Sequence, residues 1–251
     1  MDAMDELYYA LRALRSEKKS LDREFLNDVK DLFTKTMEGL PETTGEYLHN
    51  LHQKKPSKQT LKMMIDAVPS SLSYYNMRGE LPIQSAVRKS ASVAYIPLLA
   101  IEGVRYNVGG ADKRGGLHVE NSYGIDRRNV LKLLVKMRVA SNPEPDDMAC
   151  LNAIKELKES NLFHKQDIQD YDLLNFSCHT ATQLRFQYLA QMDPEGLKSY
   201  RWKPLIHRQI IGFDTTEVFQ LFLATALKHH PDDTGLLFQT NDEGKQLLSA
   251  H

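Results

Sequence analysis

A short apolar block that returns at a nearly constant interval constrains the fold of this chain more than any other feature. The blocks at 60–65, 95–100 and 130–135 lie 35 residues apart, and similar blocks at 186–189 and 219–222 lie 33 residues apart. A tandem repeat of this length is typical of a supersecondary unit that stacks on copies of itself. The interval therefore predicts a helical repeat solenoid.

A second repeated element precedes each apolar block. Residues 78–86 (Arg-Gly-Glu-Leu-Pro-Ile-Gln-Ser-Ala) are matched by 114–122 (Arg-Gly-Gly-Leu-His-Val-Glu-Asn-Ser), with looser copies at 44–49, 202–207 and 241–250. Proline and glycine in these segments mark turns and helix starts. Each unit is therefore predicted to contain a turn, a short helix, a second turn and a longer helix.

These residues resemble the ankyrin repeat, whose unit of about 33 residues opens with a turn and a Thr-Pro-Leu-His type of helix start. Segment 81–86 keeps the family's Pro, aliphatic and Ala positions, 203–205 keeps the Pro and Leu, and 126–135 is similar to the family's second helix. No copy contains the full Thr-Pro-Leu-His string, and the step from Leu131 to Phe186 is 55 residues. The resemblance implies an all-α, degenerate ankyrin-like array.

The segments outside the regular interval define the predicted organisation. Residues 1–40 carry helical apolar periodicity and are interpreted as an amino-terminal helical cap, or alternatively as a separate helical hairpin. Degenerate repeats then fill 41–251, with an insertion at about 139–170 and a truncated last repeat from about 241. The insertion is interpreted as an extra helix or as an eroded repeat.

The insertion has a predicted substructure of its own. Pro143 and Pro145 indicate a loop, after which apolar residues recur at helical spacing. The residues expected on that face are Met148, Leu151, Ile154 and Leu157.

The apolar blocks are expected to form the core between repeats because their spacing follows the helical period. Pro97, inside the second block, is expected to be the first residue of its helix, where its missing N–H is no loss. The predicted core residues are Leu61, Met64, Leu98, Leu131, Leu134, Leu221 and Phe222.

The composition narrows the function classes. Lys plus Arg number 32 against 33 Asp plus Glu, so no general field attracts nucleic acid or an anionic membrane. No apolar run approaches the roughly 20 residues of a membrane span, and the acidic start lacks the apolar region of a secretory signal. Cys150 and Cys178 stand outside any metal or redox spacing. An intracellular protein without a cofactor or a metal is expected.

Catalytic motifs do not stand out. Gly109, Gly110, Gly115 and Gly116 flank a segment without the Lys-Ser or Lys-Thr of a phosphate loop, so a flexible finger with positive backbone angles is expected there. A structural role is expected for His49, which aligns with the histidine of the ankyrin family. The adjacent His229 and His230 are expected to form a solvated helix cap.

Two alternative functions are an enzymatic role and nucleic-acid binding. The chain could be an enzyme or the regulatory portion of one, with a pocket near 139–170 where His164, Asp167 and His179 converge. A weaker alternative is nucleic-acid binding. The residues that would carry it are Arg127, Arg128, Lys132 and Lys136.

The favoured hypothesis is a non-enzymatic scaffold that binds an unidentified protein. The resemblance implies that the partner lies along the concave face, on the fingers between repeats, and 74–78 aligns with one such finger. Tyr, Trp and Arg carry much interface energy, although packing of the rings between adjacent units is an equal alternative. The predicted partner-binding residues are Tyr74, Tyr75, Arg78, Tyr106, Asn107, Lys113, Arg114, Tyr200, Arg201 and Trp202.

Overall fold

A computed structural model gives the structure of residues 41–120, 128–136, 143–179, 183–198 and 215–231. Within these ranges the regular structure is helical and contains no strand, which confirms the all-α class. The chain divides into two compact units, Met1–Arg127 and Arg128–His251. The predicted cap at 1–40 and the predicted last repeat lie outside the described residues, so the predicted repeat boundaries stay a prediction.

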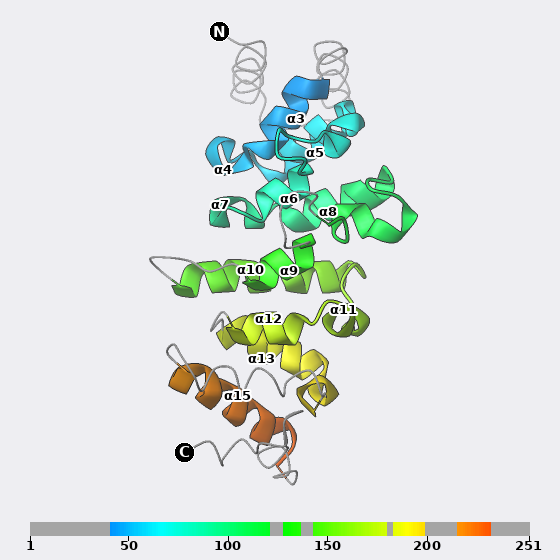
Figure 1. Ribbon diagram of the computed structural model, residues 1–251. Coiled ribbons are helices and arrows are strands. Elements are labelled where there is room, and N and C mark those ends of the chain that lie inside the picture. Colours follow the sequence, from blue (N-terminus) through cyan, green and yellow to red (C-terminus); the bar gives the residue numbers. More distant parts are fainter. Residues whose placement is uncertain (1–40, 121–127, 137–142, 180–182, 199–214, 232–251) are drawn as a thin grey trace, which may run out of the picture. The chain divides into compact units, whose positions relative to one another are not determined.

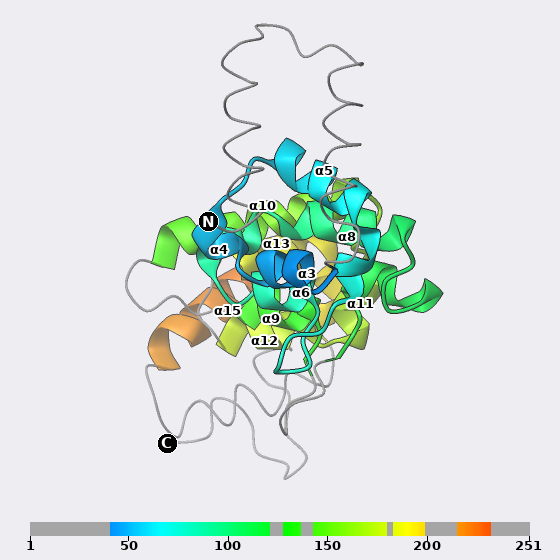
Figure 2. The same cartoon turned by 90° about the horizontal axis from the view of Figure 1, so that it is seen from above.

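Unit 1 contains two successive sets of helices with the same order. The first set is α3 (Pro41–His49), α4 (Leu51–Lys54) and α5 (Lys58–Ala67), followed by the 3-10 helix η1 (Pro69–Ser73); the second is α6 (Pro82–Ala86), α7 (Ser90–Val93) and α8 (Ile96–Arg105), followed by η2 (Ala111–Gly116). Equivalent helices pack on one another: α3 on α6, α4 on α7 and α5 on α8. Figure 1 shows the two sets as successive layers, and Figure 2 shows α3 and α6 superposed in the view from above.

Local sequence signals set the beginnings of these helices. The Ser57 hydroxyl accepts a hydrogen bond from the Thr60 N–H at 3.0 Å and caps α5. Pro82 occupies the first turn of α6, where the Gln84 side chain accepts from the Leu81 N–H at 2.8 Å. Pro97 likewise lies in the first turn of α8, but as its second residue, because the helix begins at Ile96, one residue earlier than expected.

The glycine segment that follows α8 is packed, which corrects the expected flexible finger. Gly115 and Gly116 are buried, and their φ angles are positive as predicted, at 65° and 93°. A Cβ on Gly115 would lie 2.1 Å from the Ala100 carbonyl oxygen, and one on Gly103 would lie 2.5 Å from the Gly115 oxygen. The two glycines thus let the η2 backbone lie directly on α8. The turn expected at the start of 114–122 is present, with left-handed φ angles at Arg114 and Gly115. Residues 117–120 are not helical, and the remainder of the short helix expected there lies outside the described residues.

Unit 2 also consists of helices that pack on one another. They are α9 (Val130–Lys136), α10 (Pro143–Glu159), α11 (Lys165–Asp170), α12 (Leu173–His179), α13 (Gln183–Met192), the 3-10 helix η3 (Pro194–Lys198) and α15 (Thr215–His229). Helix α12 packs on α9 and α13, α10 packs on α13, and α15 packs on both α12 and α13. Figure 1 shows α9 and α10 beside one another, then α12 and α13, then α15.

A buried arginine joins three helices of unit 2. Arg185 of α13 is 1% exposed. Its Nε donates to Asp147 Oδ1 of α10 at 2.5 Å, and its Nη1 donates to the Leu134 and Val135 carbonyl oxygens of α9. The guanidinium therefore satisfies carbonyl groups at the end of α9 while Asp147 balances its charge.

The apolar blocks supply buried residues at the predicted interval. In four blocks the same three positions, separated by three residues and then one, are buried: Leu61, Met64 and Ile65; Ile96, Leu99 and Ala100; Leu131, Leu134 and Val135; Phe186, Leu189 and Ala190. This confirms the predicted core for Leu61, Met64, Leu131 and Leu134.

The core prediction is wrong for two residues, Leu98 and Leu221. Leu98 is only partly buried because it lies on the face of α8 that also carries Ile101 and Val104, which are 41% and 47% exposed. Leu221 of α15 is also only partly buried. The side chain of Phe222 lies outside the described residues.

The 139–170 segment departs from its predicted loop. Helix α10 begins at Pro143 and includes Pro145, so the prolines start the helix instead of preceding it. The first turn of a helix tolerates proline because its N–H groups have no intrahelical acceptor. Leu151, Ile154 and Leu157 are buried as predicted, whereas Met148 is 44% exposed.

Candidate protein-binding surface

A seven-residue turn, 74–80, connects η1 to α6 and is fixed by the side chain of Asn76. Its Oδ1 accepts from the N–H groups of Arg78 at 2.8 Å and Glu80 at 3.0 Å. Its Nδ2 donates to Ser85 Oγ at 3.1 Å and Glu80 Oε2 at 3.3 Å. The backbone closes the turn through Asn76 N–H to Glu80 O at 3.0 Å, with Gly79 at a φ of 63°. The turn is therefore pre-organised by hydrogen bonds.

The apex of the turn presents large side chains to solvent. Met77 is 100% exposed and Tyr75 is 52% exposed. Arg78 is also exposed. Two large apolar side chains separated by one residue on an ordered turn form an available contact surface. The structure thus leaves Tyr75 and Arg78, two predicted binding residues, accessible to a partner.

Tyr74, the first residue of the turn, has a packing role. A Cβ on Gly45 of α3 would lie 2.4 Å from Tyr74 Cδ1, so the absence of a side chain at 45 makes room for the ring. The Tyr74 ring also lies 6.2 Å from the His49 ring, at an interplanar angle of 60°. The Tyr74 ring therefore packs against α3.

His49, at the end of α3, ties α3 to the turn and to α6. Its Nε2 lies 3.0 Å from the Tyr74 carbonyl oxygen, and its Nδ1 lies 2.7 Å from Ser85 Oγ. Because the carbonyl only accepts, Nε2 carries the proton in this arrangement and Nδ1 accepts. Burial lowers the pKa of His49 despite the opposing effect of the hydrogen bond to Tyr74 and of nearby Glu80 and Glu46. These contacts agree with the predicted structural role.

A cleft of about 590 Å³ opens beside the turn. Its walls come from α3, α4, the turn 74–80, α6 and the residues that connect α6 to α7. The lining residues are Glu46, His49, Asn50, His52, Tyr74, Asn76, Met77, Arg78, Glu80, Ser85, Arg88 and Lys89. Their side chains are mostly polar, with Met77 and Tyr74 as apolar contributors.

The charges of the cleft are unevenly compensated. Glu80 is 2% exposed and accepts from Arg88 Nε at 2.6 Å. Arg78 and Lys89 are both exposed. Among the described residues, no carboxylate forms an ion pair with either side chain. The Glu80–Arg88 pair therefore holds the wall together, while Arg78 and Lys89 face solvent at the rim.

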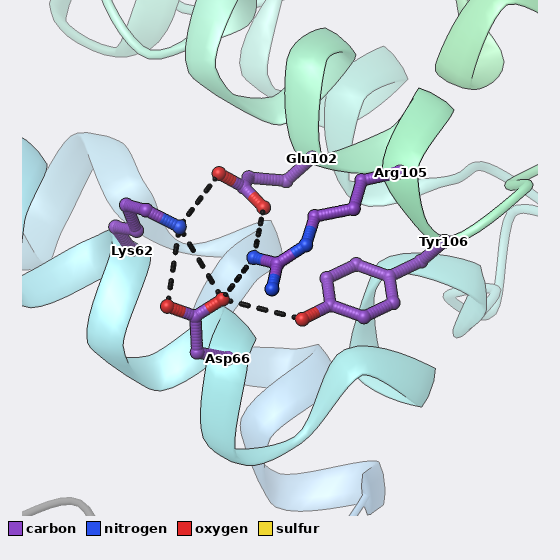
Figure 3. Close-up of polar contacts among 5 residues, drawn as sticks. All are labelled: Lys62, Asp66, Glu102, Arg105 and Tyr106. Atoms are coloured by element: carbon purple, nitrogen blue, oxygen red, sulfur yellow. Dashed lines mark hydrogen bonds and ion pairs between the residues drawn. The ribbon is translucent and has the colours of Figure 1, made fainter. Parts of the chain in front are cut away.

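The predicted residue Tyr106 belongs to a network of ion pairs between α5 and α8 (Figure 3). Lys62 Nζ lies 3.1 Å from Asp66 Oδ2 and 2.9 Å from Glu102 Oε1. Arg105 Nη1 lies 2.7 Å from Asp66 Oδ1 and 3.2 Å from Glu102 Oε2. The Tyr106 hydroxyl donates to Asp66 Oδ1 at 3.2 Å. The network joins the two long helices of unit 1.

The pKa values of the network follow from this pairing. Burial would raise the pKa of Asp66, but its contacts with Lys62, Tyr106 and Arg105 outweigh burial and lower that pKa. Burial would lower the pKa of Lys62, but hydrogen bonds to Glu102 and Asp66 outweigh it and raise that pKa. Both groups are thus held in their charged forms.

The other predicted finger residues have mixed surroundings. Asn107, before η2, and Lys113, within η2, are exposed, and Arg114 is half-buried with a φ of 42°. Tyr200, Arg201 and Trp202 lie outside the described residues. Among the predicted binding residues that are described, Tyr75 and Arg78 alone combine exposure with the cleft or its adjoining turn.

The residues of the enzyme alternative have structural contacts where the structure describes them. Asp167 is buried and its Oδ2 accepts from the His164 N–H at 2.7 Å, which caps α11. The side chain of His179 lies outside the described residues. His230 Nε2 lies 2.9 Å from the Pro194 carbonyl oxygen, so His230 links α15 to η3, which corrects the expected solvated cap.

The basic residues of the nucleic-acid alternative contact aromatic rings. Lys132 Nζ lies 5.8 Å from the ring centre of Tyr171 and 5.6 Å from that of Phe176, and Lys136 Nζ lies 5.9 Å from Phe176. Arg127 lies outside the described residues. The two lysines thus have cation–π contacts within unit 2.

The described ranges contain neither a group of residues suited to a metal ion nor a helix suited to span a membrane. No cluster of three or more His, Cys, Asp or Glu residues suited to a metal ion occurs in the described part of the chain. None of the described helices combines the length and the apolar character of a membrane span.

The comparisons with known proteins give no assignment. No protein-family model matches the chain, and neither a curated protein nor a solved structure matches it. The candidate surface therefore has to be judged on its own geometry.

Sequence reasoning missed most of the cleft. The roles of Asn76, Arg88 and Lys89 depend on tertiary contacts between the turn and α6. The consecutive basic residues 88–89 after a short helix were the available signal. Without the fold, nothing in the sequence showed that this pair and the turn share one cleft.

Proposed function

We propose that this chain is a non-enzymatic helical-repeat protein, similar to an ankyrin array, that binds another protein through the turn 74–80 and the adjoining cleft. The observation that carries this proposal is the exposure of Met77 and Tyr75 at the apex of a turn that Asn76 holds in place. A folded protein gains little from an ordered, exposed apolar pair unless another molecule covers it.

Two features support the repeat architecture. Within unit 1, each helix of the first set packs on its equivalent in the second set, as expected for copies related by translation. The buried positions of the apolar blocks also recur at the same relative places in four segments of the chain. Both features are expected of a stacked array, whatever its family.

The energetics favour binding at the turn. Covering a large apolar side chain contributes about 1.5 to 3 kcal/mol. A partner that covers both Tyr75 and Met77 therefore gains a useful part of an interface energy. The hydrogen bonds of Asn76 reduce the ordering cost because the turn does not need to be fixed on binding.

The test is quantitative affinity capture with matched variants of the full chain. We expect the double variant Tyr75→Asp, Met77→Asp to lose the proteins that the wild-type chain retains. The control, Ile101→Asp, places a carboxylate on an exposed apolar position of α8 outside the turn, and we expect it to keep them. The proposal fails if the double variant and the wild-type chain, both folded by circular dichroism, retain the same proteins.

A further inference from the structure

We propose that the cleft beside the turn 74–80 binds a protein segment in which acidic residues flank one large apolar side chain. This inference rests on the proposed function and adds the chemistry of the partner. It follows from which charges of the cleft are already compensated and where its apolar contacts lie.

The basic groups at the rim are available for a partner's carboxylates. Three cationic residues line the cleft, and Arg88 among them is paired with the buried Glu80. Among the described residues, no carboxylate pairs with Arg78 of the turn or with Lys89, which directly precedes α7. A carboxylate brought next to either residue gains an attraction that this chain does not supply itself, and complementary charge gives both specificity and a faster association.

The apolar requirement comes from the turn. Met77 is fully exposed and also lines the cleft. Its flexible thioether side chain adapts to apolar groups of different shape. Tyr75 adds a large, rigid ring beside it. A volume of about 590 Å³ is sufficient for one large side chain together with adjoining backbone.

The remaining lining favours a protein segment over a nucleic acid. Glu46 and Glu80 place two carboxylates in the cleft, and the formal net charge of the chain is −1. A polyanion needs an extended row of cations, whereas isolated carboxylates need only Arg78 and Lys89. Asn50 and His52 supply further polar groups for the backbone of a peptide.

The test begins with selection of random dodecapeptides, displayed on phage, against the immobilised full chain. We expect the selected peptides to carry Asp or Glu on both sides of one Leu, Met or Phe. A synthetic peptide of that consensus is then titrated against the variants. We expect the charge reversal Arg78→Glu, Lys89→Glu to weaken binding about tenfold or more. The control pair Lys113→Glu, Lys228→Glu changes exposed lysines outside the cleft and should leave the affinity unchanged.

A charge-swapped peptide distinguishes lost attraction from a misfolded variant. With Lys in place of its acidic residues, the peptide should bind the Arg78→Glu, Lys89→Glu variant more tightly than the wild-type chain. Selection of basic or uncharged peptides, no selection at all, displacement of the consensus peptide by poly(U) RNA at equal concentration, or equal affinity for the charge-reversed variant would each overturn the inference.

The same series separates this inference from the proposed function. If peptides without acidic residues are selected and Tyr75→Asp, Met77→Asp abolishes their binding, the surface is right and the partner chemistry is wrong. If that double variant also binds every selected peptide as the wild-type chain does, both the surface and the partner chemistry are wrong.

Discussion

The two loops that follow the long helices of unit 1 occupy equivalent places but have opposite surfaces. The turn 74–80, after α5 and η1, holds Met77 and Tyr75 out to solvent. The segment 107–117, after α8, buries Gly115 and Gly116, and the Gly115 backbone lies directly on α8. Corresponding places in the two helix sets of unit 1 therefore do not give equivalent surfaces, because single residues such as Asn76 and Gly115 decide how each loop is fixed.

The largest expected effect is on the packed loop. Gly115→Ala places a Cβ 2.1 Å from the Ala100 carbonyl oxygen at a φ of 65°, so we expect a loss of about 3 kcal/mol or more in unfolding free energy. Gly110→Ala is the matched control, because its Cβ meets no atom within 4 Å. It should cost only about 1 to 2 kcal/mol, from the positive φ. Urea unfolding measures both, and equal losses would contradict the packed loop.

The exposed loop should depend on Asn76. Asn76→Ala removes the acceptor of the Arg78 and Glu80 N–H groups and a donor to Ser85, so we expect about 2 kcal/mol of destabilisation by urea unfolding. Asn76→Asp keeps an acceptor but replaces the donor with a carboxylate oxygen beside Glu80 Oε2, so we expect this variant to be destabilised as well at neutral pH. A fully stable alanine variant would show that the turn is not fixed by this side chain.

The attachment of the exposed loop to α3 should weaken in mild acid. Because burial lowers the pKa of His49 in the folded state, the unfolded chain takes up a proton more readily. The contribution of His49 is thus complete above its ordinary pKa of about 6.5 and falls as pH drops below that value. We expect the melting temperature of the wild-type chain to fall between pH 7 and pH 5, and that fall to be smaller in His49→Gln.

A different group governs the stability at lower pH. The lowered pKa of Asp66 contributes stability that is complete above the ordinary Asp value of about 3.9 and is lost as pH falls through the folded-state pKa. The stability contributions of His49, at the turn, and of Asp66, in the α5–α8 network, are therefore lost in different pH ranges. An identical pH profile for the wild-type chain and His49→Gln would contradict the role of His49.

The smallest expected effect is at Tyr106. Tyr106→Phe removes the 3.2 Å hydrogen bond to Asp66 from a partly exposed site, so we expect a loss of about 0.5 kcal/mol. We also expect unchanged capture of partner proteins, because Tyr106 belongs to the helix network and not to the cleft. Lost capture with unchanged stability would move the binding surface to the second loop.

Much of the fold could be predicted because the apolar spacing records which side of each helix is buried. The blocks containing Leu61 and Leu131 gave correct buried positions, and the proline rule placed Pro97 in a first turn. The predicted burial of Leu98 was wrong because a run of adjacent apolar residues does not show which of them faces outward. The loop predicted at Pro143 and Pro145 was wrong because proline is as typical of a helix start as of a loop.

The candidate site was predictable only in part. Aromatic and basic residues at 74–78 indicated a contact surface, but the same argument applied to Tyr106, whose hydroxyl is bonded to Asp66. The glycine pairs at 109–110 and 115–116 predicted a flexible loop. Gly115 instead allows the backbone to pack closely against α8. Long-range pairs such as His49 with Ser85 arise from stacking of α3 on α6, which the sequence alone does not order.

The most direct test of the account places a photo-crosslinking amino acid at either loop of the full chain. Incorporation at position 77 should give covalent adducts with a partner protein in cell extract, and excess unlabelled wild-type chain should suppress them. Incorporation at position 113, which is also exposed, should give none above background. Adducts from 113 with none from 77 would contradict the claim that the turn 74–80 is the binding surface.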